Sequence, residues 1–186
     1  GTMHQDPNDA SRMYLLGQFT QRASVIKFSK SNMNVDWKLE IKSSSGAVAP
    51  ASEMNEIYSY VQPSNNEYLY ACGYKWEDPL QETYRKAVTM KLSTDGEIQF
   101  LHQFGQATNK DVCRSVTYDS SRREVVYMLE TTSERLRPDY SRYQRYSGSN
   151  SDLLIITMRE SGSFVNGYNI NMDTASVSMG AGTHSL

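Results

Sequence analysis

The stretch KLSTDGEIQF, residues 91–100, decides the fold class. Its two halves alternate apolar and polar residues, and the Asp95-Gly96 pair between them supplies a tight turn. The pattern predicts a β-hairpin, because a period of two places every second side chain on one face and Asp-Gly suits the turn. Residues 28–37 (FSKSNMNVDW) and 158–166 (MRESGSFVN) have the same layout. The sequence therefore predicts one hairpin in three copies.

The three hairpins can be aligned residue by residue. Phe28 matches Leu92 at a separation of 64 residues, whereas Trp37 matches Phe100 at a separation of 63. We therefore expect one additional residue in the first turn. In the third copy Met158 matches Leu92, at a separation of 66. No stretch of the chain sustains an apolar stripe with a period of 3.6, so the pattern predicts no helix.

A second strand pattern precedes each hairpin. Its copies align on a shared tyrosine: Tyr14 in residues 12–18, Tyr70 in residues 68–74 and Tyr127 in residues 125–131. Before the second and third copies, a further strand ends in a polar turn, at residues 63–66 and 119–121. Proline, serine, asparagine and aspartate are the residues that such tight reversals require. The repeating unit thus contains four short strands.

A unit of roughly 55 to 65 residues with four strands is typical of a propeller blade. We expect an all-β fold, a β-propeller segment of about three four-stranded antiparallel blades. A β-sandwich with accidental internal similarity is the alternative. Blades are expected at residues 12–41 (partial, three strands), 57–104 and 112–170. The expected strands are 57–62, 68–74, 87–92 and 97–104, then 112–118, 124–131, 153–158 and 164–170.

Two end segments flank the expected blades. Residues 1–11 are expected to form a tail or a partial strand, and residues 171–186 a flexible end or the start of another blade. Propellers have four to eight blades, because fewer leave blade faces exposed. We therefore expect the chain to be a piece of a larger ring, completed by further blades of the same polypeptide or by other chains.

The hairpins also carry a family resemblance. An apolar arm ending in Lys-Leu or Lys-Phe, then S-x-D-G-x-I-x-W/F, resembles the SBBP-type β-propeller repeats, over most of residues 12–170. The turn is more loosely similar to the Asp-box turn of sialidase-like propellers, which lies away from their active site. Two copies depart from it, with Asn32-Met33 and Ser161-Gly162 in place of Asp-Gly. The resemblance implies no catalytic residue, and it favours an extracellular or cell-surface location.

Composition excludes several functional classes. The net charge of −2 and the pI near 5.9 predict no general affinity for nucleic acid, whose binding needs clustered positive charge. No run approaches the roughly 20 apolar residues of a membrane-spanning helix. Cys72 and Cys113 form no CxxC motif, so neither a zinc site nor a redox motif is indicated. Two buried thiols or a disulfide are both possible, and no cofactor or metal is expected.

The expected binding surface is the end of the blades that bears the long loops. Repeat proteins build binding surfaces by varying loop length on one face. The loop at residues 132–152 combines arginine and tyrosine, which interface hot spots use. We expect this loop to contact other proteins. The alternatives are that it is a solvated loop without a role, or that it binds a nucleic acid or a phosphorylated ligand. The expected partner-binding residues are Arg135, Arg137, Tyr140, Arg142, Tyr143, Arg145 and Tyr146, extended by Trp76 and Tyr84 from the shorter loop.

No enzyme motif is present in the sequence. Neither a nucleophile elbow, a P-loop, a dinucleotide fingerprint, HExxH nor a calcium loop occurs. His4 and His184 fall in the expected tails, and His102 falls inside a strand. We expect a non-catalytic scaffold that binds other proteins through its loop-bearing face. The alternatives are a segment of a secreted sugar-binding or glycoside-acting propeller, and a structural subunit of a filament or lattice.

Overall fold

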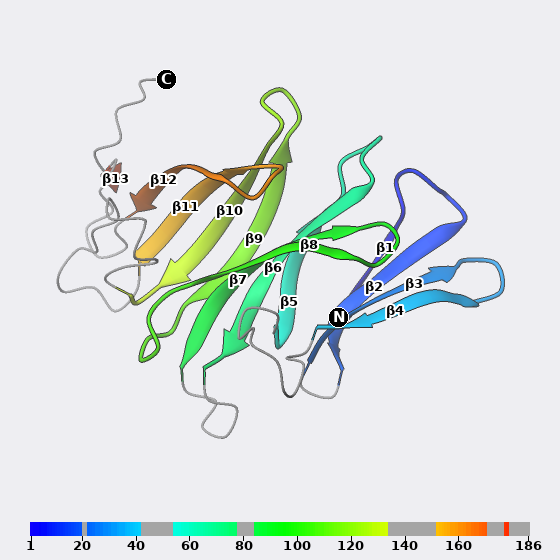
Figure 1. The fold of residues 1–186 in the computed structure, drawn as a ribbon, viewed down its shortest axis with the longest axis horizontal. Coiled ribbons are helices and arrows are strands. Elements are labelled where there is room, and N and C mark those ends of the chain that lie inside the picture. Colours follow the sequence, from blue (N-terminus) through cyan, green and yellow to red (C-terminus); the bar gives the residue numbers. More distant parts are fainter. Residues whose placement is uncertain (20–21, 42–53, 78–83, 134–151, 171–176, 179–186) are drawn as a thin grey trace.

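Three separate antiparallel β-sheets make up the structure, a computed structural model that describes residues 1–19, 22–41, 54–77, 84–133, 152–170 and 177–178 (Figure 1). All regular elements within these residues are strands, which confirms the all-β class. In each sheet the first four strands neighbour one another in chain order. The three sheets therefore share one meander topology, as a repeated unit requires.

The strand bounds agree closely with the sequence pattern. The first sheet contains β1 (Thr2–Gln5), β2 (Arg12–Phe19), β3 (Arg22–Ser29) and β4 (Val35–Glu40). The second contains β5 (Glu56–Val61), β6 (Tyr68–Trp76), β7 (Arg85–Ser93) and β8 (Ile98–Phe104). The third contains β9 (Val112–Asp119), β10 (Glu124–Thr131), β11 (Asp152–Arg159) and β12 (Phe164–Ile170), with β13 (Val177–Ser178) added at its edge. The eight strands expected between residues 57 and 170 are confirmed to within two residues at each end.

The first sheet has a strand that the sequence pattern did not separate from a tail. β1 pairs with β2 in antiparallel register, from Thr2 opposite Leu16 to Gln5 opposite Met13. The first sheet therefore has four strands: the three expected within residues 12–41 and one within residues 1–11, which were expected to form a tail or a partial strand. β1 is four residues long and exposed along its length. Such a strand shows no buried alternation, so its pairing supplies the only signal.

The hairpin turns between the third and fourth strands of each sheet repeat in atomic detail. In the second and third sheets the amides of Ser93 and Arg159 donate to the carbonyl four residues later, at 2.8 Å in both. In the first sheet the Ser29 amide reaches the carbonyl five residues later, which confirms the additional residue. Met33, Gly96 and Gly162 occupy the matching position with φ of 59°, 91° and 87°. In all three hairpins a bulge follows the matching residue of the third strand, which is Lys27, Lys91 or Thr157.

The pairing register corrects one of the sequence alignments. Tyr14 and Tyr70 lie opposite Lys27 and Lys91, which are matching residues of the hairpins. Tyr127 does not lie opposite Thr157, the residue that matches these lysines. Val126 does, and Tyr127 is one residue out of step. Because side chains alternate along a strand, a slip of one residue moves Tyr127 to the opposite face of its sheet.

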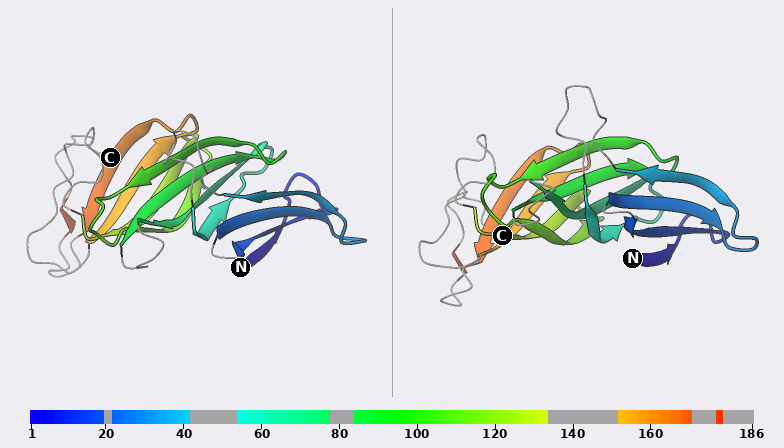
Figure 2. Two further views of the ribbon diagram at one scale, coloured as in Figure 1. Left: turned by 60° about the horizontal axis from the view of Figure 1, so that its bottom comes forward. Right: turned by 90° about the horizontal axis from the view of Figure 1, so that it is seen from below.

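The three sheets stack face to face in chain order (Figure 2). The first strand of the second and of the third sheet packs on the sheet before it: β5 contacts β2 and β3, and β9 contacts β6 and β7. Two apolar cores result. One joins the first two sheets through residues such as Leu16, Val25, Leu69 and Met90. The other joins the second and third sheets through residues such as Tyr70, Phe104, Tyr127 and Met158.

Candidate functional site

The expected binding surface lies at one end of the stacked sheets. Since consecutive strands are antiparallel, the connections β2–β3, β6–β7 and β10–β11 all leave from the same end, here called the loop end. The seven arginines and tyrosines expected there lie outside the described residues: Arg135, Arg137, Tyr140, Arg142, Tyr143, Arg145 and Tyr146. Of the expected set, the structure places Trp76 and Tyr84.

Trp76 belongs to a group of stacked side chains at the ends of β6 and β7. It is the last residue of β6 and pairs with Arg85, the first residue of β7. Tyr74 lies two residues earlier on the same face, and its ring meets the Trp76 ring edge-on at 5.1 Å. The Arg85 guanidinium lies 5.2 Å from the centre of each ring. Such cation–π contacts hold the arginine over the rings and present its charge at the loop end.

The stack continues onto the neighbouring strands. The Tyr58 ring, at a bulge in β5, lies 5.5 Å from the Tyr74 ring. The Arg114 guanidinium, from β9 in the third sheet, lies 5.1 Å from the centre of the Tyr58 ring. These five residues form what we call the arginine–aromatic cluster: Tyr58, Tyr74, Trp76, Arg85 and Arg114. The cluster joins four strands from two sheets, so it depends on how those sheets stack.

Carboxylates border the arginine–aromatic cluster. The Tyr74 hydroxyl donates to Glu56 at 3.0 Å, and burial raises the pKa of Tyr74. Glu130 accepts from Arg114 at 2.8 Å. Partial burial disfavours the charged form of Arg114, but the contact with Glu130 outweighs it and raises the pKa of this arginine. At neutral pH the Tyr74 hydroxyl therefore stays neutral and Arg114 stays charged.

Tyr84 lies near the cluster without joining it. Its carbonyl accepts from the Glu77 amide at 2.9 Å, which prolongs the β6–β7 pairing beyond the strands. The side chain of Tyr84 is half-buried, and the ion pair between Lys86 and Glu77, at 3.0 Å, borders the same end. The structure thus brings Trp76 into the cluster and leaves Tyr84 beside it. Sequence reasoning missed Tyr58 and Arg114, which fall inside the expected strands, and Arg85, which was expected in the shorter loop and is the first residue of β7.

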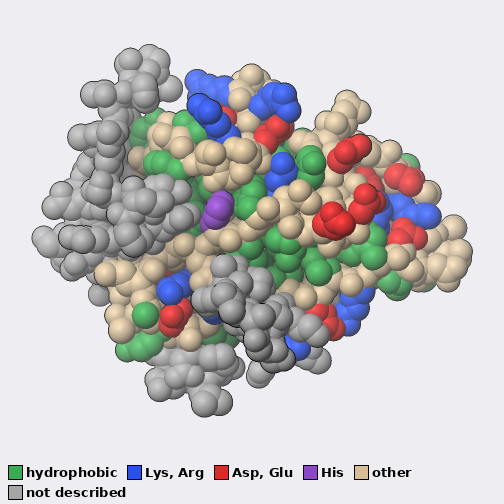
Figure 3. Space-filling view, viewed as in Figure 1, with side chains coloured by type: hydrophobic (Ala, Val, Ile, Leu, Met, Phe, Trp, Pro, Cys, Tyr) green, Lys and Arg blue, Asp and Glu red, His purple; other side chains and the backbone are tan. Residues whose placement is uncertain are grey.

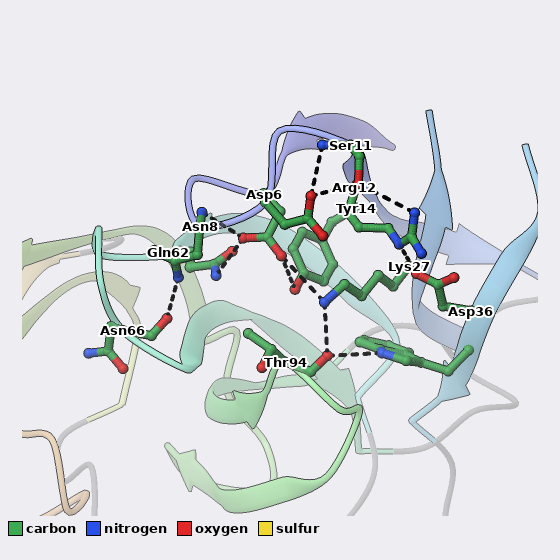
Figure 4. Close-up of polar contacts among 12 residues, drawn as sticks. Asp6, Asn8, Ser11, Arg12, Tyr14, Lys27, Asp36, Gln62, Asn66 and Thr94 are labelled. Atoms are coloured by element: carbon green, nitrogen blue, oxygen red, sulfur yellow. Dashed lines mark hydrogen bonds and ion pairs between the residues drawn. The ribbon is translucent and has the colours of Figure 1, made fainter. Parts of the chain in front are cut away.

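The opposite end of the sheets holds a polar network between the first and second sheets (Figure 4). Asp6, almost fully buried, accepts from the Tyr14 hydroxyl at 3.1 Å and from Gln62 at 3.1 Å, and Lys27 lies 3.3 Å away. Lys27 also donates to the carbonyl of Thr94, in the next hairpin turn, at 3.4 Å. Lys91 donates likewise to the carbonyl of Glu160, at 2.9 Å.

These contacts are structural and repeat between sheets. Thr94 and Glu160 occupy the same place in their turns, as Lys27 and Lys91 do in their strands. The lysine therefore fastens each hairpin turn to the sheet before it. Asp6, Tyr14 and Lys27 and the Thr94 carbonyl all have partners in this network, whereas the buried Oε1 of Gln62 has no hydrogen-bond partner among the described residues. The paired groups come from both sheets, so they help to hold the stack together.

No catalytic constellation is found within the described residues. They contain no group of three histidine, cysteine, aspartate or glutamate side chains that could hold a metal ion. His102 stacks on Phe100 at 4.8 Å, and His4 lies in β1, not in a tail, with its ring 4.4 Å from Tyr60. Cys72 and Cys113 are both free and fully buried, so of the two alternatives the structure has two buried thiols and not a disulfide. His184 lies outside the described residues.

The surface carries charges of both signs. Figure 3 shows lysine, arginine, aspartate and glutamate side chains interspersed over one view of the molecule. Among the described residues there is no helix long and apolar enough to cross a membrane. No family model matches the chain, and no curated protein is similar to it.

Proposed function

We propose that the chain is a segment of a β-propeller and acts as a non-catalytic scaffold that binds other proteins at its loop end. Support for the propeller comes from three sheets that share the order of their first four strands, of which the second and third each place the first strand against the preceding sheet. Such radial repetition of four-stranded sheets is how propellers protect their edges. The resemblance of the hairpins to SBBP-type repeats points the same way.

The observation that carries the binding proposal is the arginine–aromatic cluster at the loop end. Tryptophan, tyrosine and arginine are the residues most enriched among interface hot spots. Here Trp76 and Arg85 are held in place by Tyr74, which is itself buried, so they lose little conformational freedom on binding. Acidic groups around the cluster, such as Glu56 and Glu130, supply the polar rim that interfaces have.

A comparison of two triple variants tests the proposal. The first removes three positive charges of the loop: Arg137→Ala, Arg142→Ala and Arg145→Ala. The matched control removes three exposed positive charges at the opposite end: Lys30→Ala, Arg122→Ala and Arg159→Ala. Each full chain is immobilised in an extract of the cells that express it, and bound proteins are quantified by mass spectrometry.

The two variants should behave differently. We expect the loop variant to keep its thermal unfolding midpoint and to lose at least about 10-fold of its bound partner, which corresponds to about 1.4 kcal/mol. The control should retain the partner. Equal partner retention by both variants would refute binding through the arginines of the loop. Unfolding of the loop variant would show that the loop is structural and would refute the assignment equally.

A further inference from the structure

One face of the first sheet is only partly covered, whereas the matching face is buried in the other two: Met13, Leu15 and Ile26 are half-buried there, although Phe28 is 6% exposed. In the second and third sheets, the residues of this face pack against the preceding sheet and are at most 2% exposed in the two central strands: Leu69, Ala71, Met90 and Leu92, then Val125, Tyr127, Ile156 and Met158. In the first sheet the matching residues are also apolar: Met13, Leu15, Ile26 and Phe28. Beside them Met3 and Val35 are 57% and 59% exposed.

Both internal joints between sheets contain the same steric contact. A Cβ atom added to Gly96 would lie 3.1 Å from the ring of Trp37, and one added to Gly162 would lie 2.9 Å from the ring of Phe100. The aromatic residue belongs to the fourth strand of one sheet, and the glycine belongs to the hairpin turn of the next. At each joint, a large side chain therefore lies over a residue that has none.

The two outer faces of the stack invert this contact. On the first sheet the glycine position holds Met33, which is 65% exposed. On the third sheet the position of the aromatic ring holds Asn166, because Asn166 pairs with Thr157 as Trp37 pairs with Lys27. The large residue has moved from the fourth strand to the turn. The outer faces are thus complementary to each other in the same way as the inner ones.

We propose that the outer face of the first sheet packs on the outer face of the third sheet of a second copy, so that two chains close one ring. This inference rests on the propeller arrangement proposed above. Six sheets fall within the range of four to eight that propellers use. The contact is head to tail, and a head-to-tail contact gives a closed ring when its rotation closes. Contact between two first sheets would instead set Met33 against Met33.

The third sheet supplies the apolar partner surface for this contact. Val126, Met128 and Ile155 lie on the face that carries Asn166, since they alternate with the residues packed on the second sheet. Thr157 replaces the lysine that fastens each inner joint. The new joint therefore depends on apolar burial and should be weaker than the inner ones. We expect dimerisation that depends on concentration.

Mass and cross-linking test the pairing. The mass measured by light scattering should rise to twice the 21.1 kDa of one chain as the chain concentration is raised. A range of about 1 to 100 µM detects dissociation constants in the micromolar range. Val35→Glu should weaken association by at least about 30-fold, because it buries an unpaired charge. Val35→Thr is the matched control. For geometry, a Met33→Cys chain is mixed with a size-tagged Asn166→Cys chain and treated with a short bismaleimide.

A mixed cross-linked product, absent when Gln99→Cys replaces Asn166→Cys, is the expected result. The native Cys72 and Cys113 are fully buried and should not react. A chain that stays monomeric at the highest concentration overturns the pairing, as does a dimer without the mixed product or an open polymer of increasing mass. A monomer that still captures its partner through the loop end would overturn this inference and leave the proposed function standing.

Discussion

Replacement of Asp111 tests how the loop end is held. This carboxylate lies just before β9 and is fully buried. Its Oδ1 accepts from the Thr131 hydroxyl at 2.6 Å and from the amides of Thr132 and Ser133 at 3.1 and 3.2 Å. Its Oδ2 accepts from the Ser133 hydroxyl at 2.6 Å. One side chain thereby fastens the end of β10 and the start of the long loop to strand β9.

The cost of Asp111→Ala follows from those partners. The amide of Ser133 also reaches the hydroxyl of Thr131, at 3.1 Å, so it retains an acceptor. Two hydroxyls and the Thr132 amide lose theirs. At about 1 kcal/mol for each of these three hydrogen bonds, two from buried hydroxyls and one from a part-buried amide, the variant should lose about 3 kcal/mol. For a chain of this size that lowers the thermal midpoint by about 6 to 12 °C.

Asp111→Asn is the matched control. An amide oxygen can accept the three Oδ1 bonds, and the amide nitrogen can donate to Ser133. Asparagine already occupies the matching position of the second sheet, where Asn55 accepts from the Trp76 amide at 2.7 Å. We therefore expect Asp111→Asn to change the free energy of unfolding by less than about 1 kcal/mol.

The pH dependence separates the two forms further. Burial raises the pKa of Asp111 above its usual 3.8, although its hydrogen bonds act in the other direction. The folded state therefore binds more protons than the unfolded state at pH values between the two pKa values. Stability contributed by this group should rise as pH falls through that window. As pH is lowered from 7 to 4, the free energy of unfolding of the wild type should rise relative to that of Asp111→Asn.

Urea unfolding followed by circular dichroism measures all three chains at each pH. Equal midpoints for the alanine and asparagine variants would refute the hydrogen-bond argument. A loss below about 1 kcal/mol for Asp111→Ala would do the same, because a buried network of this kind must cost more to disrupt.

Three further changes have definite expected results. Gly105→Ala should destabilise the chain by about 3 kcal/mol or more, because φ is 114° and the new Cβ would clash with Oδ2 of buried Asp111; an unchanged thermal midpoint would contradict this. Lys27→Met removes the cation 3.3 Å from buried Asp6 and should cost about 2 kcal/mol in urea unfolding, whereas no cost would show that the lysine is not needed at the joint. Cys72 and Cys113 should not react with Ellman's reagent until urea unfolds the chain, because both are buried and burial raises the pKa of Cys113; rapid reaction of the native protein would disprove the packing of this core.

The strands and hairpin turns could be predicted because their signals are local. Alternation along 87–92 and 97–104 and the Asp95-Gly96 turn act over a few residues, and the structure places strands and a left-handed residue there. The additional residue of the first turn followed from two separations alone. β1 could not be predicted, because an exposed strand of four residues has no buried face to mark it.

The register of the strands could not be read from the sequence, because it is defined by which residues pair across the sheet. Tyr14, Tyr70 and Tyr127 look alike in sequence, yet only Tyr14 and Tyr70 lie opposite the matching lysines. The slip at Tyr127 is invisible along the chain, because a strand shifted by one residue keeps its alternation and only exchanges its faces.

The residues of the candidate site were also predictable only in part. Trp76 was expected at the loop end because it was assigned to the shorter loop, and the structure makes it the last residue of β6. Arg114 was not expected there, because an arginine within an expected strand has no distinguishing local pattern, and Arg85 was not singled out among the residues of the loop. They gain their place from rings on other strands, and Arg114 comes from a different sheet.

Sequence alone was enough to establish a thrice-repeated hairpin unit and its turns, since period-two alternation and turn chemistry operate between near neighbours. The tertiary structure decided which faces meet, as where Trp37 bonds to the Thr94 carbonyl 57 residues away. Contacts between sheets join residues that share no local pattern, and apolar burial, which drives the stacking, has no direction of its own. The outcome therefore depends on side-chain size across the joint, such as a ring over a glycine.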